Sequence, residues 1–178
     1  MAAPLTPAPA PEADFRPQFA PLFRLAPGLE LILASASPRR RQFLSEWGLP
    51  FATTRPTGVE PRPEADESPD AYTRRAAQAK ALAVERRLDP ATRARALILA
   101  ADTVVALDGD ILGKPRDTAH ALEMLARLAG RSHEVISAVC LLPPPGWPGG
   151  PGELFSDVSR VFFHAWPHSV LAAYARTH

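Results

Sequence analysis

The feature that most constrains the fold is the alternation of short apolar runs with helix-start signals along the chain. The apolar run at residues 29–34 has the length of a buried strand, and the Ser-Pro pair at 37–38 is typical of a helix N-terminus. A second Ser-Pro pair at 68–69 begins another helix, which is followed by a buried run at residues 97–101. Strands that alternate with helices predict an α/β fold, in which helices flank a mixed, twisted sheet.

The remaining elements follow from turn and cap residues. An Asp-Gly pair at 108–109 separates two apolar stretches and predicts a tight hairpin over residues 104–112. Phe43, Leu44 and Trp47 are expected to form the buried stripe of the first helix. The other predicted elements are a helix over 117–130, strands over 133–142 and 158–165, and a final helix over 167–176.

Composition limits the organisation and the class of the protein. Residues 1–28 contain seven prolines and predict a disordered Pro/Ala-rich tail, which leaves residues 29–178 as the folded domain. A net charge of +1 predicts no nucleic-acid partner, and the absence of a long apolar run predicts no membrane span. The N-terminus has no secretory pattern and Cys140 is a single cysteine, so we expect a cytoplasmic protein without disulfides.

The first candidate site follows the first predicted strand. Ser35 and Ser37 provide hydroxyls, and Arg39 and Arg40 provide guanidinium groups, at the point where a helix begins. Free backbone amides and the positive end of the helix dipole favour an anion there, and arginine in a first turn opposes the dipole unless an anion binds. The alternative is a capped helix with a solvated basic first turn.

The second candidate site is Asp102 with its neighbour Thr103, at the expected end of the buried strand. A carboxylate next to an apolar strand is costly unless it is paired, hydrogen-bonded or bound to a metal. Ligands of open α/β sheets bind outside the carboxyl ends of strands, which is where this side chain is expected. The alternative is that Asp102 caps a turn, and that Thr103 is an ordinary strand residue.

Two lysines and one histidine are weaker candidates. Lys114 follows Gly113, but Pro115 and the glycine spacing exclude a P-loop, so a phosphate contact competes with a solvated hairpin exit. Lys80 lies among small residues of the second helix, where solvation is the usual outcome. His133 begins a strand without an HExxH zinc motif and is expected to be a structural hydrogen-bonding residue.

Several motifs occur together in one order: residues 33–40, Lys80, residues 101–105, residues 113–117 and residues 128–135. In this arrangement the chain resembles the Maf family of nucleoside triphosphate pyrophosphatases over residues 30–178. The resemblance implies an α/β fold like that of inosine triphosphatase, with two lobes around a cleft. It also implies a divalent metal, Mg²⁺ or Mn²⁺, a homodimer, and hydrolysis of nucleoside triphosphates to the monophosphate and pyrophosphate.

The resemblance also implies roles for individual residues. The Arg39-Arg40 pair and the Ala-Asp-Thr motif at 101–103 are similar to the branch that acts on dTTP and UTP. Asp102 would be the proton acceptor, Arg39 and Thr103 would select the substrate, and Glu60 with Asp102 would hold the metal. The expected phosphate-binding residues are Ser35, Ser37, Arg40, Lys80 and Lys114.

The chain departs from the family pattern in two places. A second acid of the family is replaced by Pro61, next to Glu60. The sequence ends at His178, before a segment in which the family carries a specificity glutamine, so the chain is expected to lack that C-terminal segment. This departure motivates two further hypotheses: a catalytically weak nucleotide-binding or regulatory protein, and an inactive fragment that is kept for protein contacts.

Overall fold

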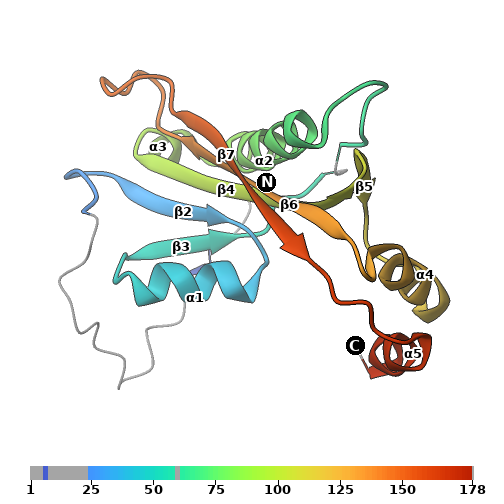
Figure 1. The fold of residues 1–178 in the computed structure, drawn as a ribbon. Coiled ribbons are helices and arrows are strands. Elements are labelled where there is room, and N and C mark those ends of the chain that lie inside the picture. The colour runs from blue at the N-terminus through green and yellow to red at the C-terminus, as the bar shows by residue number, and fades with distance from the viewer. Residues whose placement is uncertain (1–5, 8–23, 59–60, 178) are drawn as a thin grey trace. The chain divides into compact units, whose positions relative to one another are not determined.

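A computed structural model describes residues 6–7, 24–58 and 61–177 of the chain (Figure 1). The strands are β1 (Thr6–Pro7), β2 (Glu30–Ala34), β3 (Phe51–Thr54), β4 (Ala96–Leu107), β5 (Asp110–Leu112), β6 (Ser132–Leu142) and β7 (Glu153–Phe162). The helices are α1 (Pro38–Glu46), α2 (Pro69–Glu85), α3 (Pro90–Arg93), α4 (Thr118–Leu128) and α5 (His168–Thr177). The predicted α/β fold is confirmed.

The strands form one mixed sheet in the order β1-β3-β2-β4-β6-β7, with β5 paired to β4 outside this path. β2 pairs in parallel with β3 and with β4, whereas β1 pairs antiparallel with β3 and β5 pairs antiparallel with β4. Within the predicted Pro/Ala-rich tail, β1 is therefore a short piece of strand. Most of that tail lies outside the described residues, so the prediction of disorder stays a prediction.

β4 is longer than predicted, and this changes the setting of Asp102. The expected break after residue 101 is wrong, because one strand of 12 residues continues to Leu107. β2 pairs with β4 as far as Ala100, and β5 pairs with it from Val105. Asp102 thus lies inside a strand, in the stretch that pairs with neither β2 nor β5, and it does not cap a turn.

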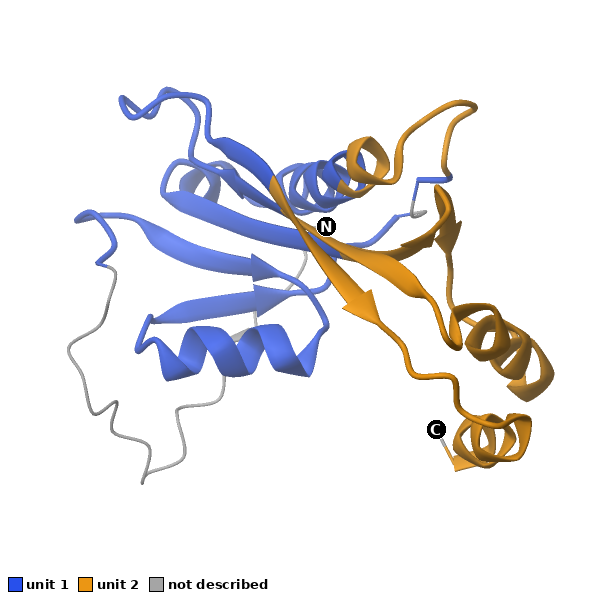
Figure 2. Ribbon diagram, viewed as in Figure 1, with its two compact units in different colours: residues 1–62, 74–102, 139–155 blue, residues 63–73, 103–138, 156–178 orange. Residues whose placement is uncertain are grey.

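The chain divides into two compact units (Figure 2). Unit 1 comprises residues 1–62, 74–102 and 139–155, and unit 2 comprises residues 63–73, 103–138 and 156–178. In unit 1, Leu31 and Leu33 of β2 pack with Leu44 of α1 into one hydrophobic core. Ile32 and Ile98 are almost fully buried as well, so β2 and the start of β4 are covered on both faces, as parallel strands are in α/β folds.

Unit 2 contains the predicted hairpin and two helices. Asp108 and Gly109, which join β4 to β5, have φ angles of 54° and 87°, the left-handed values that a tight two-residue turn requires. Arg131 binds the carboxylate of Asp108 at 2.6 and 2.8 Å, which fixes this turn to the start of β6. α4 and α5 contact one another, and Asp117 caps α4 through the amide of His120 at 2.7 Å.

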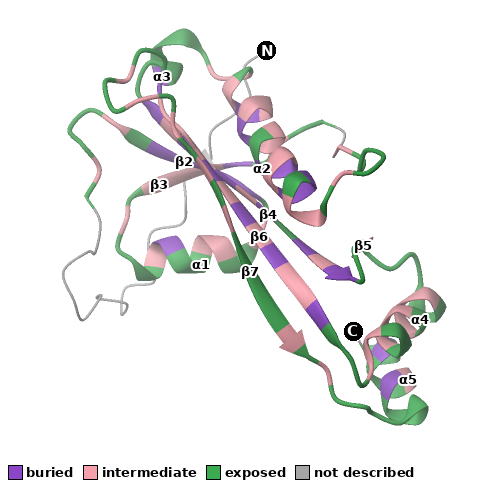
Figure 3. Ribbon diagram, turned by 45° about the horizontal axis from the view of Figure 1, so that its top comes forward, coloured by how far each residue is buried: buried purple, intermediate pink, exposed green. Residues whose placement is uncertain are grey.

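Burial corrects the predicted stripe of α1 (Figure 3). Only Leu44 is buried, at 3% exposed, whereas Phe43 and Trp47 are 52% and 42% exposed. Two short elements, β3 and α3, were not predicted, and β7 begins at Glu153, several residues before its predicted start. These elements are short or polar, so they carry little of the periodicity on which prediction relies.

Candidate active site

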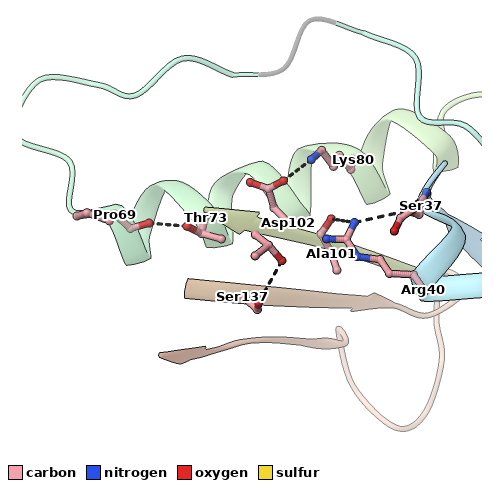
Figure 4. Close-up of polar contacts among 10 residues, drawn as sticks. Ser37, Arg40, Pro69, Thr73, Lys80, Ala101, Asp102 and Ser137 are labelled. Carbon is pink, nitrogen blue, oxygen red and sulfur yellow. Dashed lines mark hydrogen bonds and ion pairs between the residues drawn. The ribbon is translucent and has the colours of Figure 1, made fainter. Parts of the chain in front are cut away.

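The centre of the candidate site in unit 1 is an ion pair between Asp102 of β4 and Lys80 of α2 (Figure 4). Asp102 is 7% exposed, and the Lys80 side chain retains 22% of its accessible surface. A carboxylate this deeply buried is stable only if it is paired or hydrogen-bonded. Lys80 provides that partner, so the expectation that Lys80 is solvated is wrong.

The sequence around Lys80 explains why its ammonium reaches β4. Ala76, Ala77 and Ala81 of α2 are completely buried, and Val84 is nearly so. These residues lie on one face of the helix, and Lys80 lies on the same face, four residues after Ala76 and three after Ala77, so its long stem can extend along the apolar surface. Because the alanines have short side chains, they leave room for the ammonium beside the strand.

The N-terminus of α1 is organised by Ser35 and Arg40, not by Ser37. The Ser35 hydroxyl accepts a hydrogen bond from the Ser37 amide at 3.1 Å, whereas the Ser37 side chain makes no capping hydrogen bond. The Arg40 guanidinium donates to the carbonyl oxygen of Ala101 at 2.9 Å and to Ser35 Oγ at 3.4 Å. Ser37 is therefore the N-cap residue of α1, as predicted, but its side chain makes no capping hydrogen bond.

Arg40 lies in an environment that disfavours its charge. Burial lowers the pKa of the Arg40 guanidinium, while the negative charge of Asp102 acts in the opposite direction. The side chain already donates to Ala101, the residue that precedes Asp102 on β4. This geometry makes Arg40 a link between α1 and β4, in addition to any contact with a phosphate.

The other predicted basic residues lie on the surface. Arg39 is exposed in the first turn of α1, and Lys114 is exposed in the loop that follows β5. Arg39 belongs to unit 1, with Lys80 and Asp102, whereas Lys114 belongs to unit 2. Both side chains are accessible to a ligand, and the structure assigns neither of them to the cluster around Asp102.

Thr103 contacts a residue that the sequence did not single out. Its Oγ1 lies 3.0 Å from Oγ of Ser137 on β6, and either hydroxyl can donate this hydrogen bond. Successive side chains of a strand point to opposite faces, and Asp102 is buried while Thr103 is exposed. The pairing of β4 with β6 brings Ser137 to this position, and no local pattern in the sequence reports that pairing.

The metal ligands can be tested only in part, because Glu60 lies outside the described residues. Among the residues that are described, no three His, Cys, Asp or Glu side chains form a metal-binding group. Mg²⁺ is often held by one or two carboxylates, with water and substrate phosphates completing its ligands. Asp102 is a buried carboxylate of this type. The described residues therefore fit a metal ion that one or two carboxylates hold, with phosphate oxygens of the substrate and water as the other ligands.

Unit 2 also contains a pocket of about 350 Å³ beside the β4–β5 turn, lined in part by Asp108, His133, Glu134 and Arg160. None of the predicted site residues that the structure describes lines this pocket. His133 is buried, and its Nδ1 has no hydrogen-bond partner in the described part of the chain. The expectation that His133 is a structural hydrogen-bonding residue is therefore not met at that atom.

Taken within unit 1, the arrangement combines a buried carboxylate, an ammonium paired with it and a guanidinium bound to the same strand. A carboxylate can accept a proton from a water molecule whose pKa a bound metal would lower, and the exposed Arg39 adds positive charge suited to an anion. The chemistry that these groups support best is attack of water on a phosphate ester or anhydride.

Comparisons with known proteins agree with this chemistry. The family described as "Maf-like protein" matches residues 30–178. A dTTP/UTP pyrophosphatase of Nitratidesulfovibrio vulgaris is 48% identical over 147 residues, which are 83% of this chain and 66% of the relative. The dTTP/UTP pyrophosphatase of Oleidesulfovibrio alaskensis is also 48% identical, over 83% of this chain and 64% of the relative.

Two further findings complete the comparison. The chain spans about two thirds of the length of these relatives, at 66% and 64%. A solved structure of a HAM1 protein from Coxiella burnetii has a TM-score of 0.47 and 18% identity, over 78% of this chain and 75% of that one. In the part of the chain that the structure describes, no helix has both the length and the apolar character needed to cross a bilayer.

Proposed function

Because this chain belongs to the Maf-like protein family, we propose that it hydrolyses nucleoside triphosphates to the monophosphate and pyrophosphate, with dTTP and UTP as preferred substrates. The observation that carries the proposal is the buried carboxylate of Asp102 in β4, which forms an ion pair with Lys80 of α2. The relatives named dTTP/UTP pyrophosphatase support the choice of substrate.

In the proposed reaction, Asp102 accepts a proton from the water that attacks the α-phosphorus, and pyrophosphate leaves. Lys80 would hold the carboxylate in place through the ion pair, and its ammonium would meet phosphate oxygens once substrate binds. Asp102 and Glu60 would hold Mg²⁺ or Mn²⁺, which neutralises phosphate charge and lowers the pKa of water so that a carboxylate suffices as the acceptor.

The remaining residues would bind and select the substrate. Arg39 is exposed and charged, and we assign it with Thr103 to recognition of the nucleotide. Ser35, Ser37 and Lys114 would donate to the phosphates. Arg40 would contribute positive charge to the same path, although its hydrogen bond to Ala101 makes it chiefly a residue that positions β4.

The test is analysis of the products formed from a panel of nucleoside triphosphates with Mg²⁺ or Mn²⁺. We expect pyrophosphate and the nucleoside monophosphate, formed fastest from dTTP and UTP. Asp102→Asn should lower the rate by at least ~10²-fold, the usual scale for a lost general base. Release of orthophosphate with the nucleoside diphosphate would contradict the cleavage position, and near-normal turnover by Asp102→Asn would contradict the role of Asp102.

Two properties accompany the proposal. We propose that the chain acts in the cytoplasm and that it forms a homodimer, the latter as its resemblance to the Maf family implies. Cell fractionation tests the location. Sedimentation analysis of the purified chain tests the dimer, and a sedimentation profile of a monomer at all concentrations would refute it.

A further inference from the structure

β7 is the last strand of the sheet in the part of the chain that the structure describes, because the strand order ends with β6-β7. It runs through 10 residues, Glu153–Phe162, and Figure 3 colours most of it as exposed. Edge strands are usually protected by lysine, by proline, by shortness or by a covering element. Residues 153–162 contain neither lysine nor proline, so β7 is a candidate interaction surface.

Two apolar side chains of β7 face solvent. Val158 is 50% exposed and Phe162 is 78% exposed, and both belong to unit 2. Residues an even number of positions apart lie on the same face of a strand, so these two side chains form one apolar strip. An apolar strip beside an open edge is typical of a strand that pairs with another strand.

The backbone groups of the outer edge are identified by alternation along β7. The amide of Phe163 donates to the carbonyl oxygen of Arg131 at 3.0 Å, in the segment that leads into β6. Because the backbone groups of successive strand residues point to opposite edges, those of Val158 and of the other even-numbered residues point outward. The carbonyl of Leu154 agrees with this alternation, since it accepts a hydrogen bond from the Arg74 guanidinium at 2.9 Å.

A second copy of β7 can pair with this edge in the antiparallel direction around a two-fold axis. An axis through Asp157 or through Arg160 would place two identical charges opposite one another, which is unfavourable. An axis through Ser159 would place the apolar Val158 opposite Arg160. An axis through Val158 avoids both conflicts and places Val158 opposite its own counterpart. The other pairs of this register are Ser156 with Arg160, Asp157 with Ser159, and Leu154 with Phe162.

We propose that two copies of the chain associate through β7, antiparallel and with Val158 on the two-fold axis, so that the two sheets become one continuous sheet. The inference rests on the homodimer proposed above and identifies its interface, and it does not depend on catalytic activity. The outward amides and carbonyls gain partners, and the strip of Val158 and Phe162 is removed from water.

The first experiment uses the contact of position 158 with itself. Val158→Lys and Val158→Glu each place two like charges about 5 Å apart and remove an apolar contact, so each should weaken the dimer by roughly tenfold. A mixture of the two variants should form a heterodimer, because the charges are then opposite. Sedimentation analysis of the two variants and of their mixture measures both effects. Ser159→Lys, which faces Asp157 in this register, is the matched control and should not weaken the dimer.

The second experiment is a cross-link between two Val158→Cys chains. Residues paired by hydrogen bonds in an antiparallel ladder have Cα atoms about 5.5 Å apart, which is within the range for a disulfide. Oxidation with copper phenanthroline should therefore give a covalent dimer on a non-reducing gel. Arg160→Cys is the matched control, because its two copies would lie about 13 Å apart along the strands. Cys140 is buried and should not cross-link.

The outcomes separate this inference from the proposed dimer and from the proposed reaction. A wild-type dimer whose charged variants are not rescued by mixing, or whose Arg160→Cys variant cross-links as well as Val158→Cys, refutes this interface and leaves the dimer intact. A monomeric wild type without a Val158→Cys cross-link overturns both. If a charged variant does not fold, the cysteine variants decide the question. Hydrolysis of UTP is measured separately, and its absence would contradict only the proposed reaction.

Discussion

The ion pair between Lys80 and Asp102 leads to a prediction about stability that does not depend on activity. Lys80→Met keeps the length and the apolar stem of the side chain and removes only its charge. Asp102, whose side chain is 9% exposed, is then left buried without its partner. Removing one partner of a hydrogen-bonded buried charge costs about 1.5–3 kcal/mol, and up to about 5 kcal/mol in a dry interior.

Lys80 retains 22% of its surface, so water can reach the variant site and the lower part of this range applies. We expect Lys80→Met to lower the free energy of unfolding by about 2 kcal/mol at neutral pH. Asp102→Asn should cost less, since the ammonium can turn toward water. The double variant should then be about 1–2 kcal/mol more stable than the sum of the single effects.

Urea unfolding of the four proteins gives these values, provided that the m-values agree. The control is the pair between Glu30 and Arg95, whose side chains are 52% and 45% exposed. Glu30→Gln should change stability by less than about 0.5 kcal/mol, because solvent screens an exposed pair. Equal stability of Lys80→Met and the wild type, with zero coupling to Asp102, would refute the pairing on which the proposed site depends.

Three other predictions follow from the contacts. Arg40→Ala should lower the free energy of unfolding by about 1–2 kcal/mol, because the variant loses the hydrogen bonds of the guanidinium. Arg39→Ala should leave the free energy of unfolding unchanged and weaken nucleotide binding by roughly 1.5–3 kcal/mol. Equal stabilities of the two variants in urea would argue against the Arg40 link between α1 and β4. Burial raises the pKa of the Cys140 thiol, so a thiol reagent at pH 8 should modify this residue only when the chain unfolds. Rapid labelling of the native chain would contradict the burial of Cys140. At Gly152, φ is +104° and an added Cβ would lie 2.2 Å from the carbonyl oxygen of Leu141. Gly152→Ala should therefore lower the free energy of unfolding by more than about 2 kcal/mol. An unchanged melting temperature would show that the loop adopts another conformation.

The elements with strong local signals were predictable from the sequence. The Ser-Pro pairs placed the starts of α1 and α2, and the Asp-Gly pair placed the turn between β4 and β5. Each of these signals acts through the backbone of a few neighbouring residues, so it does not depend on tertiary structure. The missed strand β3 has only four residues, too few to show a period.

The partners of the site residues were not predictable in the same way. Asp102 was identified because a carboxylate in an apolar run needs a partner, yet nothing local showed that Lys80 is that partner. Ser137 was missed because its contact with Thr103 depends on which strand lies beside β4. Trp47 was assigned to the core by its helical spacing, which places a side chain on a face but does not say whether that face is covered.

The hydrogen bond from Arg40 to Ala101 has a consequence for changes in the length of the chain. The number of residues between the start of α1 and Arg40 determines where this guanidinium lies around the helix. One residue inserted into the first turn of α1, before Arg40, would move the guanidinium by about 100° around the helix axis, because a turn contains 3.6 residues. Directed evolution of residues 38 and 39 can therefore exchange side chains, but an insertion or deletion there would separate Arg40 from the strand that bears the carboxylate.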